Sequence, residues 1–221
     1  MLEFLKRGPE EAADGAPVLV LLHGRGSDMR DLQALARVLP EDGVLVTPQA
    51  PHPGAPWGYG PGWAWYRYLG EDRPDAASLD ASLRSLADFM EELPNHLGFH
   101  PGPVVLGGFS QGGTTSLAYT ARNPGGVEAV VVLSGFFPAP ETLNLDPGGL
   151  AETPVFWGHG TRDPAVPFPL ATSGRDRLRK AGVEVEAQDY AMGHQVSPEE
   201  LADLKAWLEG AVPSWTGPTR R

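Results

Sequence analysis

Uninterrupted runs of apolar residues alternate along this chain with stretches that place leucines at helical spacing. Residues 17–23 and 130–133 are almost wholly apolar, which is typical of strands buried on both faces of a parallel sheet. Residues 75–97 place a leucine, phenylalanine or methionine every three or four positions, which predicts an amphipathic helix. The alternation of the two patterns predicts an α/β fold with a mostly parallel central sheet flanked by helices.

The remaining elements follow from the same patterns. The strands that we expect cover residues 17–23, 44–47, 104–106, 130–133, 155–157 and 183–190, the last of them near the sheet edge. The helices that we expect cover residues 31–39, 75–97, the stretch after Ser110, 170–181 and 198–209. In the second of these helices, Pro94 should introduce a kink or end the helix. We expect one domain over residues 1–221, with loops at 51–62 and 136–153 and a flexible tail at 213–221.

Composition adds limits to this architecture. The chain has no cysteine, which excludes disulfide bonds, thiolate metal sites and a cysteine nucleophile. Its net charge of −11 repels phosphate backbones, so we expect no nucleic-acid partner. No apolar run approaches the ~20 residues of a membrane span, and residues 1–17 lack the apolar segment of a secretion signal. We therefore expect a cytoplasmic protein without stable membrane insertion, and the sequence leaves a homodimer open.

The strand expected at 104–106 leads into a glycine-rich turn. Gly108-Phe109-Ser110-Gln111-Gly112 fits the G-x-S-x-G motif, in which a strained turn between strand and helix exposes a serine hydroxyl. Glycines at both ends let the backbones approach closely, and the N-terminus of the following helix favours negative charge near the serine. Two other interpretations stay open. One is a glycine-rich turn that only packs, and the weaker one is a phosphate loop, in which Gly113 stands where lysine is needed.

A serine nucleophile needs a base to remove its proton and a carboxylate to orient the base. Asp163 comes just after the strand expected at 155–157, and His194 comes just after the strand expected at 183–190. The order serine, acid, histidine, with each residue in a loop after a strand, is that of α/β-hydrolases. It predicts a catalytic triad of Ser110, Asp163 and His194.

Other titratable residues fit these roles less well. His159 lies at the end of a strand, and we favour a structural ring that supports the turn over a second base. His23 opens the loop after the first central strand, where we expect its ring to hydrogen-bond to the backbone. Asp176 lies in an expected helix and Asp189 in an expected strand, which favours solvated surface charges over the orienting acid.

A metal site has little support in the sequence. His96 and His100 have the i, i+4 spacing of a helical metal pair, but Gly98 and Pro101 oppose a helix there. The serine chemistry needs no metal and no organic cofactor, so we expect none.

A serine hydrolase also needs two backbone N–H groups to stabilise the oxyanion. One belongs to the residue after the nucleophile, Gln111, and the other comes from the loop after the first central strand. In that loop the N–H of Arg25 is our candidate, because Gly24 and Gly26 flank it and let the backbone face inward. A simple glycine turn is the alternative.

Four segments resemble the phospholipase/carboxylesterase family of small α/β-hydrolases, which includes the acyl-protein thioesterases. They are LLHGRGSD at 21–28, GGFSQGG at 107–113, GHGTRDPAVPF at 158–168 and GHQVSPEEL at 193–201, in the family's order. The resemblance implies Ser110 as nucleophile with Asp163 and His194 as its partners. It also implies Arg25 and Gln111 as oxyanion donors, and a sheet without a large cap domain beside an open apolar acyl groove.

One aromatic stretch departs from the family's pattern. In the acyl-protein thioesterases an acidic residue usually follows an aromatic pair here, whereas Arg67 follows Trp65-Tyr66 in this chain. The departure favours a general esterase over protein depalmitoylation. The rings of residues 57–68 either wall an apolar substrate groove or only bury the loop, and Trp63 and Tyr66 are the ones that we expect to reach the site.

These observations predict a serine carboxylesterase that hydrolyses a small-molecule ester or thioester through an acyl-enzyme. The first alternative is a thioesterase or lysophospholipase that acts on longer acyl chains. A less favoured alternative is a non-catalytic binding module on the same fold, since a fold does not determine a function.

Overall fold

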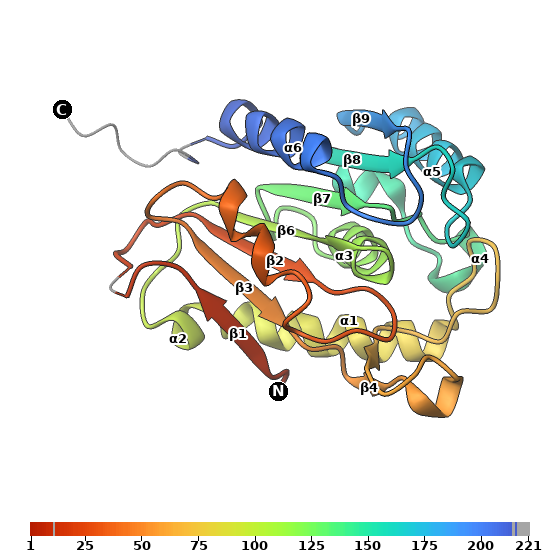
Figure 1. The fold of residues 1–221 in the computed structure, drawn as a ribbon, viewed down its shortest axis with the longest axis horizontal. Helices are drawn as coiled ribbons and strands as arrows, with labels where there is room; N and C mark the ends of the chain where they lie inside the picture. Colours follow the sequence, from red (N-terminus) through yellow and green to blue (C-terminus); the bar gives the residue numbers. More distant parts are fainter. Residues whose placement is uncertain (11, 214, 216–221) are drawn as a thin grey trace.

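A seven-stranded sheet forms the centre of the computed structural model, which describes residues 1–10, 12–213 and 215 (Figure 1). The strands follow the spatial order β1-β3-β2-β6-β7-β8-β9. Their bounds are β1 Phe4–Arg7, β2 Val18–Leu22, β3 Val44–Pro48, β6 Val104–Phe109, β7 Ala129–Leu133, β8 Val155–Gly160 and β9 Val185–Tyr190. Because β1 pairs antiparallel with β3 and the other pairs of this sheet are parallel, the predicted mostly parallel sheet is confirmed.

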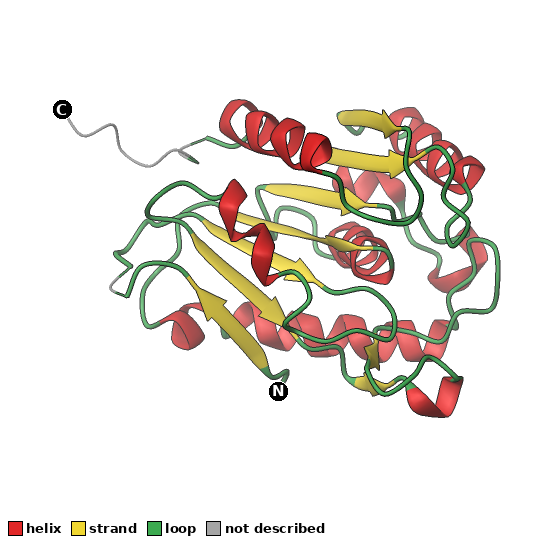
Figure 2. Ribbon diagram, viewed as in Figure 1, coloured by secondary structure: helices red, strands yellow, loops and turns green. Residues whose placement is uncertain are grey.

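Helices cover both faces of the sheet, as Figure 2 shows. The α-helices are α1 Ala76–Glu91, α2 Leu93–Leu97, α3 Gln111–Arg122, α4 Pro140–Leu143, α5 Phe168–Lys180 and α6 Pro198–Ala211. Short 3-10 helices are η1 Gln33–Val38, η2 Ala55–Trp57 and η3 Pro147–Leu150, and a small ribbon joins β4 (His52–Pro53) to β5 (Trp63–Ala64). The arrangement confirms the predicted α/β class.

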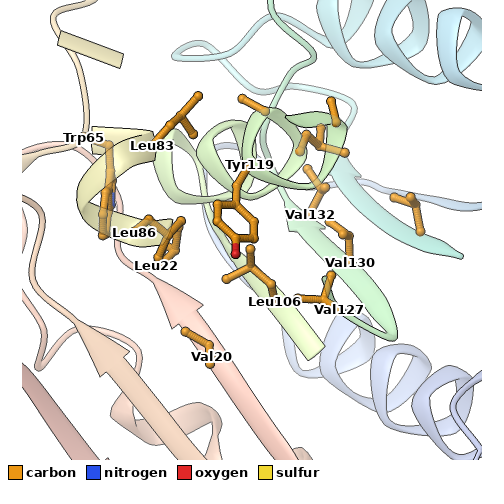
Figure 3. Packing of buried hydrophobic residues seen from close by; sticks show 14 of the residues in the cluster. Val20, Leu22, Trp65, Leu83, Leu86, Leu106, Tyr119, Val127, Val130 and Val132 are labelled. Carbon is orange, nitrogen blue, oxygen red and sulfur yellow. The ribbon is translucent and has the colours of Figure 1, made fainter. Parts of the chain in front are cut away.

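Alternate residues of the strands contribute to two hydrophobic clusters, one on each face. In β2, Val20 and Leu22 belong to the cluster against α1, α3 and α5. Leu19 and Leu21 belong to the cluster on the opposite face, against η1 and α6. Figure 3 shows part of the first cluster, to which Tyr119 of α3 contributes. Since both faces are covered, all residues of β2 are buried, which explains its uninterrupted apolar run.

Some boundaries differ from the prediction for identifiable reasons. The helix expected at 75–97 is divided, because α1 ends at Glu91 and Pro94 lies in the first turn of α2. The helix expected at 31–39 is the shorter 3-10 helix η1. Strand β1 was not predicted, because this four-residue edge strand has two exposed basic residues and only two half-buried apolar ones.

The predicted C-terminal tail lies only partly within the described residues. Of the tail predicted at 213–221, residues 214 and 216–221 lie outside the described residues, and Trp215 is buried in the cluster against α6. Within the described part, none of the helices combines the length and the apolar character that crossing a bilayer requires.

Candidate active site

Ser110 occupies the sharp turn between β6 and α3. Its backbone has φ 55° and ψ −115°, a conformation that is strained for a residue with a Cβ atom. Its N–H donates to the Leu133 carbonyl at 2.8 Å, which holds the turn against the end of β7. A Cβ atom on Gly108 or Gly112 would collide with the Leu22 carbonyl at the end of β2. The close backbone approach predicted for these two glycines is therefore confirmed.

Asp163 and His194 meet at the carboxyl ends of β8 and β9, although 31 positions separate them in the sequence. Asp163 Oδ1 accepts the N–H groups of Ala165 and Val166 at 2.8 and 2.9 Å. Asp163 Oδ2 lies 2.7 Å from His194 Nδ1. Three donors thus fix a carboxyl group whose side chain is fully shielded from solvent, and that group orients the imidazole of His194.

One cavity at this end of the sheet is lined by both Ser110 and His194. Its wall also includes Gly24, Arg25 and Gln111. Aromatic and aliphatic residues supply the apolar part of the wall, namely Tyr66, Tyr68, Phe109, Phe136, Ala165 and Val166. The Phe109 ring lies 4.7 Å from the imidazole of His194, centroid to centroid, so the base is held on one side by packing.

The ring of His23 determines how the peptide between Gly24 and Arg25 is oriented. The Ala50 N–H donates to Nε2 at 3.1 Å, so Nε2 accepts and the proton is on Nδ1, which lies 2.8 Å from the Gly24 carbonyl. Burial lowers the pKa of His23, which favours this neutral form. In a trans peptide the carbonyl and the next N–H point in opposite directions, so the Arg25 N–H points away from His23. The predicted backbone hydrogen bond of His23 is confirmed.

The side chain of Gln111 ties the aromatic loop to the serine turn. Its Oε1 accepts the Trp65 N–H at 3.1 Å, and its Nε2 donates to the Tyr66 carbonyl at 2.9 Å. Trp65 in turn donates its indole N–H to the His23 carbonyl at 3.0 Å and accepts the Ser82 hydroxyl of α1. The sequence predicts a role only for the main chain of Gln111. The glutamine in the motif was the one available signal for this link, and its partners are 45 and 46 positions away.

A family model described as Phospholipase/Carboxylesterase matches residues 9–211. The chain belongs to the phospholipase/carboxylesterase family. The match spans every residue that the sequence predicted for the site, and it confirms the resemblance found in the sequence.

Relatives of this phospholipase/carboxylesterase family member include esterases and thioesterases. Acyl-protein thioesterase 1 of Debaryomyces hansenii is 34% identical over 158 residues, covering 69% of this chain and 68% of the relative. The solved structure of esterase PE8 has a TM-score of 0.81 and 30% identity, covering 96% of this chain and 99% of that one. Acyl-protein thioesterase 2 of Zea mays has a TM-score of 0.74 and 25% identity, covering 94% and 97%. The chain is accordingly a hydrolase of the esterase and thioesterase class.

The structure separates the two aromatic residues that the sequence predicted for substrate binding in this family member. Tyr66 lines the cavity that contains Ser110. Trp63 does not line it, and this part of the prediction needs correction. Its N–H and carbonyl pair with Ser27 and Gly26 at 2.7 and 2.8 Å, and it lines a neighbouring hollow instead. Tyr68 and Phe136, which were not predicted, line the cavity with Tyr66.

His159 has the structural role that its position predicted. The ring is fully buried, and its Nε2 lies 2.9 Å from the Val166 carbonyl, which supports the turn after β8. Burial lowers the pKa of His159, so the neutral ring is favoured. The described parts of this chain contain no group of three or more histidine, aspartate or glutamate side chains with the geometry to hold a metal ion.

Proposed function

We propose that this chain is a serine carboxylesterase that hydrolyses small carboxylic esters through an acyl-enzyme. The observation that carries the proposal is the 2.7 Å contact between Asp163 Oδ2 and His194 Nδ1, beside a cavity that Ser110 and His194 share. With Nδ1 engaged by the carboxylate, Nε2 is the ring nitrogen free to act as a base toward a serine hydroxyl.

The proposed reaction has two halves with the same proton carrier. His194 Nε2 takes the Ser110 Oγ proton while Oγ forms a bond to the ester carbonyl carbon. As the tetrahedral intermediate collapses, the bond from the carbonyl carbon to the alcohol oxygen breaks and His194 returns the proton to the departing alcohol. Water then repeats the sequence on the acyl-enzyme, and the products are a carboxylic acid and free Ser110.

The negative charge on the carbonyl oxygen requires donors that are in place before the reaction. We propose the N–H groups of Gln111 and Arg25 for this role. The direction of the peptide between Gly24 and Arg25, held by His23, supports Arg25. Gln111 is the first residue of α3, where N–H groups without helical partners and the helix dipole favour negative charge.

A thioesterase acting on longer acyl chains is the second candidate. The apolar wall formed by Tyr66, Phe109 and Phe136 favours it, and relatives of the chain are named acyl-protein thioesterases. Arg67, in place of the usual acid, favours small esters. Rates for p-nitrophenyl esters and matched acyl thioesters of increasing chain length distinguish the two: a maximum at short esters supports the first candidate, and a maximum at long thioesters supports the second.

The serine mechanism is tested by Ser110→Ala with a matched serine as control. Ser134 also follows a parallel strand, has φ 56° and is fully buried, but it does not line the cavity. Ser110→Ala should lower kcat for p-nitrophenyl acetate by roughly 10⁴–10⁶-fold, as the loss of a serine nucleophile does elsewhere. Ser134→Ala should keep most of the activity. Retention of activity in Ser110→Ala would assign the nucleophile to another residue.

A further inference from the structure

The side chain of Arg25 lies at the rim of the same cavity, over two tyrosine rings. Its guanidinium carbon is 4.9 Å from the ring centroid of Tyr59 and 5.7 Å from that of Tyr68. The Tyr59 hydroxyl accepts a hydrogen bond from the Tyr68 N–H at 2.7 Å, so the two tyrosines that contact the guanidinium are linked to each other. Cation–π contacts hold a guanidinium through its face, so its N–H donors stay available.

Among the described residues, Arg25 has no carboxylate oxygen within 4.0 Å of its guanidinium. Five other arginines do have such a partner, namely Arg30, Arg73, Arg84, Arg122 and Arg175. Asp31 lines the same cavity but lies beyond this distance. A positive group with free donors therefore faces a cavity whose wall combines aromatic and aliphatic side chains with polar ones, Asp31 among them.

We propose that the Arg25 guanidinium is an anion-binding subsite that selects esters carrying a carboxylate. This inference rests on the proposed serine esterase function and adds a substrate class to it. The main-chain N–H of Arg25 faces the ester carbonyl, and its side chain binds the carboxylate at the other end of the same substrate. A guanidinium suits this task because its planar fork of donors matches the two oxygens of a carboxylate.

The shape of the cavity wall sets the rest of the substrate. The rings of Tyr66, Tyr68 and Phe136 line the same cavity as the proposed oxyanion donors and Arg25, and they suit an apolar spacer. The net charge of −11 repels anions from the surface as a whole. A preference for an anionic ester therefore depends on a local cation, and Arg25 is the arginine that lines the cavity.

The test compares esters that differ only in one charge. On the acyl side, the mono-p-nitrophenyl ester of adipic acid is compared with the p-nitrophenyl ester of adipamic acid, in which an amide replaces the carboxylate. On the alcohol side, 4-acetoxybenzoate is compared with 4-acetoxybenzamide. The ratio of kcat/KM within each pair is measured, because an altered oxyanion hole affects both members equally and cancels.

Three variants distinguish an effect of the Arg25 guanidinium from a general effect of removing one positive charge. In Arg25→Gln the ratio of anionic to neutral ester should fall about 5- to 10-fold in at least one pair, since a charge-assisted contact at an exposed rim is modest. Arg25→Lys should keep part of the preference, because it keeps the charge and loses the fork. Arg67→Gln removes the same charge from an exposed arginine that does not line the cavity, and its ratio should equal that of the wild type.

The pair that responds shows on which side of the ester the carboxylate lies. An unchanged ratio in Arg25→Gln, or equal falls in Arg25→Gln and Arg67→Gln, would overturn the subsite. If the wild type hydrolyses p-nitrophenyl acetate but none of these esters, the subsite is overturned. If it does not hydrolyse p-nitrophenyl acetate either, the proposed function itself fails, and the subsite is judged by NMR titration with adipamate. The titration should then shift the Arg25 side-chain N–H resonance, and no shift would overturn the subsite as well.

Discussion

Two buried carboxyl groups near strand β8 have opposite surroundings. Asp163, in the loop after β8, receives three hydrogen bonds, from two backbone N–H groups and from His194 Nδ1. Glu200, in the first turn of α6, packs against Gly158 within β8. Its Oε2 accepts the Ser197 N–H at 3.4 Å, whereas its Oε1 has no partner in the part of the chain that the structure describes.

The comparison shows that burial alone does not prepare a carboxyl group for catalysis. Burial raises the pKa of Glu200 to about 7, because too few donors replace the lost water. Glu200 completes the capping box of α6 with Ser197, and this is a structural role. Asp163 is equally shielded, but its donors fix both oxygens and include the imidazole that we propose as the base. The number and direction of the donors distinguish the two groups.

Replacing each carboxyl group by its amide gives the largest expected contrast. Asp163→Asn should lower kcat by roughly 10⁴-fold, because an amide N–H facing His194 Nδ1 favours the wrong tautomer. Glu200→Gln, the matched control, should stay close to the wild-type rate. The rates are measured with p-nitrophenyl acetate, and circular dichroism checks that both variants fold. Equal losses of rate in the two variants would contradict the distinction.

Gln111→Leu would remove the hydrogen-bond partner of two buried backbone groups, which would then resemble Glu200 Oε1. The Trp65 N–H and the Tyr66 carbonyl would lose their partner, at about 1–3 kcal/mol for each buried group. The melting temperature should fall, and kcat should fall about tenfold, less than the ~10²–10³ lost with a whole oxyanion donor. The control is Gln33→Leu, because the Gln33 side chain donates to the Thr47 hydroxyl rather than to the aromatic loop. This variant should leave kcat unchanged. A normal kcat in folded Gln111→Leu would show that the aromatic loop does not position the site.

Glu200→Gln should also change the pH dependence of stability, by a smaller amount. The folded-state pKa of about 7 lies above the ordinary value of 4.5, so the wild type loses stability as the pH rises through this interval. Above about pH 8 the variant should therefore be more stable by about 1–3 kcal/mol, since one pKa unit corresponds to about 1.4 kcal/mol. Below pH 4.5 the advantage should disappear. Urea unfolding at several pH values measures this difference in stability. A difference that does not vary with pH would mean that ionisation of Glu200 does not destabilise the folded state.

One physical reason explains why the fold class and the grouping of the site residues could be predicted from the sequence. Parallel strands present their carboxyl ends at the same edge of the sheet, so residues that follow such strands are brought together. Asp163 and His194 follow β8 and β9 in this way, and Ser110 follows β6. The glycines beside Ser110 could be interpreted from steric contact alone.

The aromatic loop could not be predicted in the same way. Its rings follow neither the strand period nor the helix period, so nothing in the pattern tells which of them faces the cavity. Trp63 faces away because its main chain pairs with Ser27, and Tyr66 faces inward because Gln111 holds its carbonyl. These contacts join distant segments. Likewise, the capping role of Glu200 follows from local sequence, whereas its position against Gly158 depends on how α6 packs on the sheet.

The central claim is that Asp163 and His194 activate Ser110, and covalent labelling tests it most directly. A fluorophosphonate probe is incubated with the wild type, Asp163→Asn and Glu200→Gln, and the labelled residue is mapped by peptide mass spectrometry. We expect one label, on Ser110, formed at similar rates in the wild type and Glu200→Gln and far more slowly in Asp163→Asn. A folded wild type that takes no label, or takes it on another residue, would contradict the account.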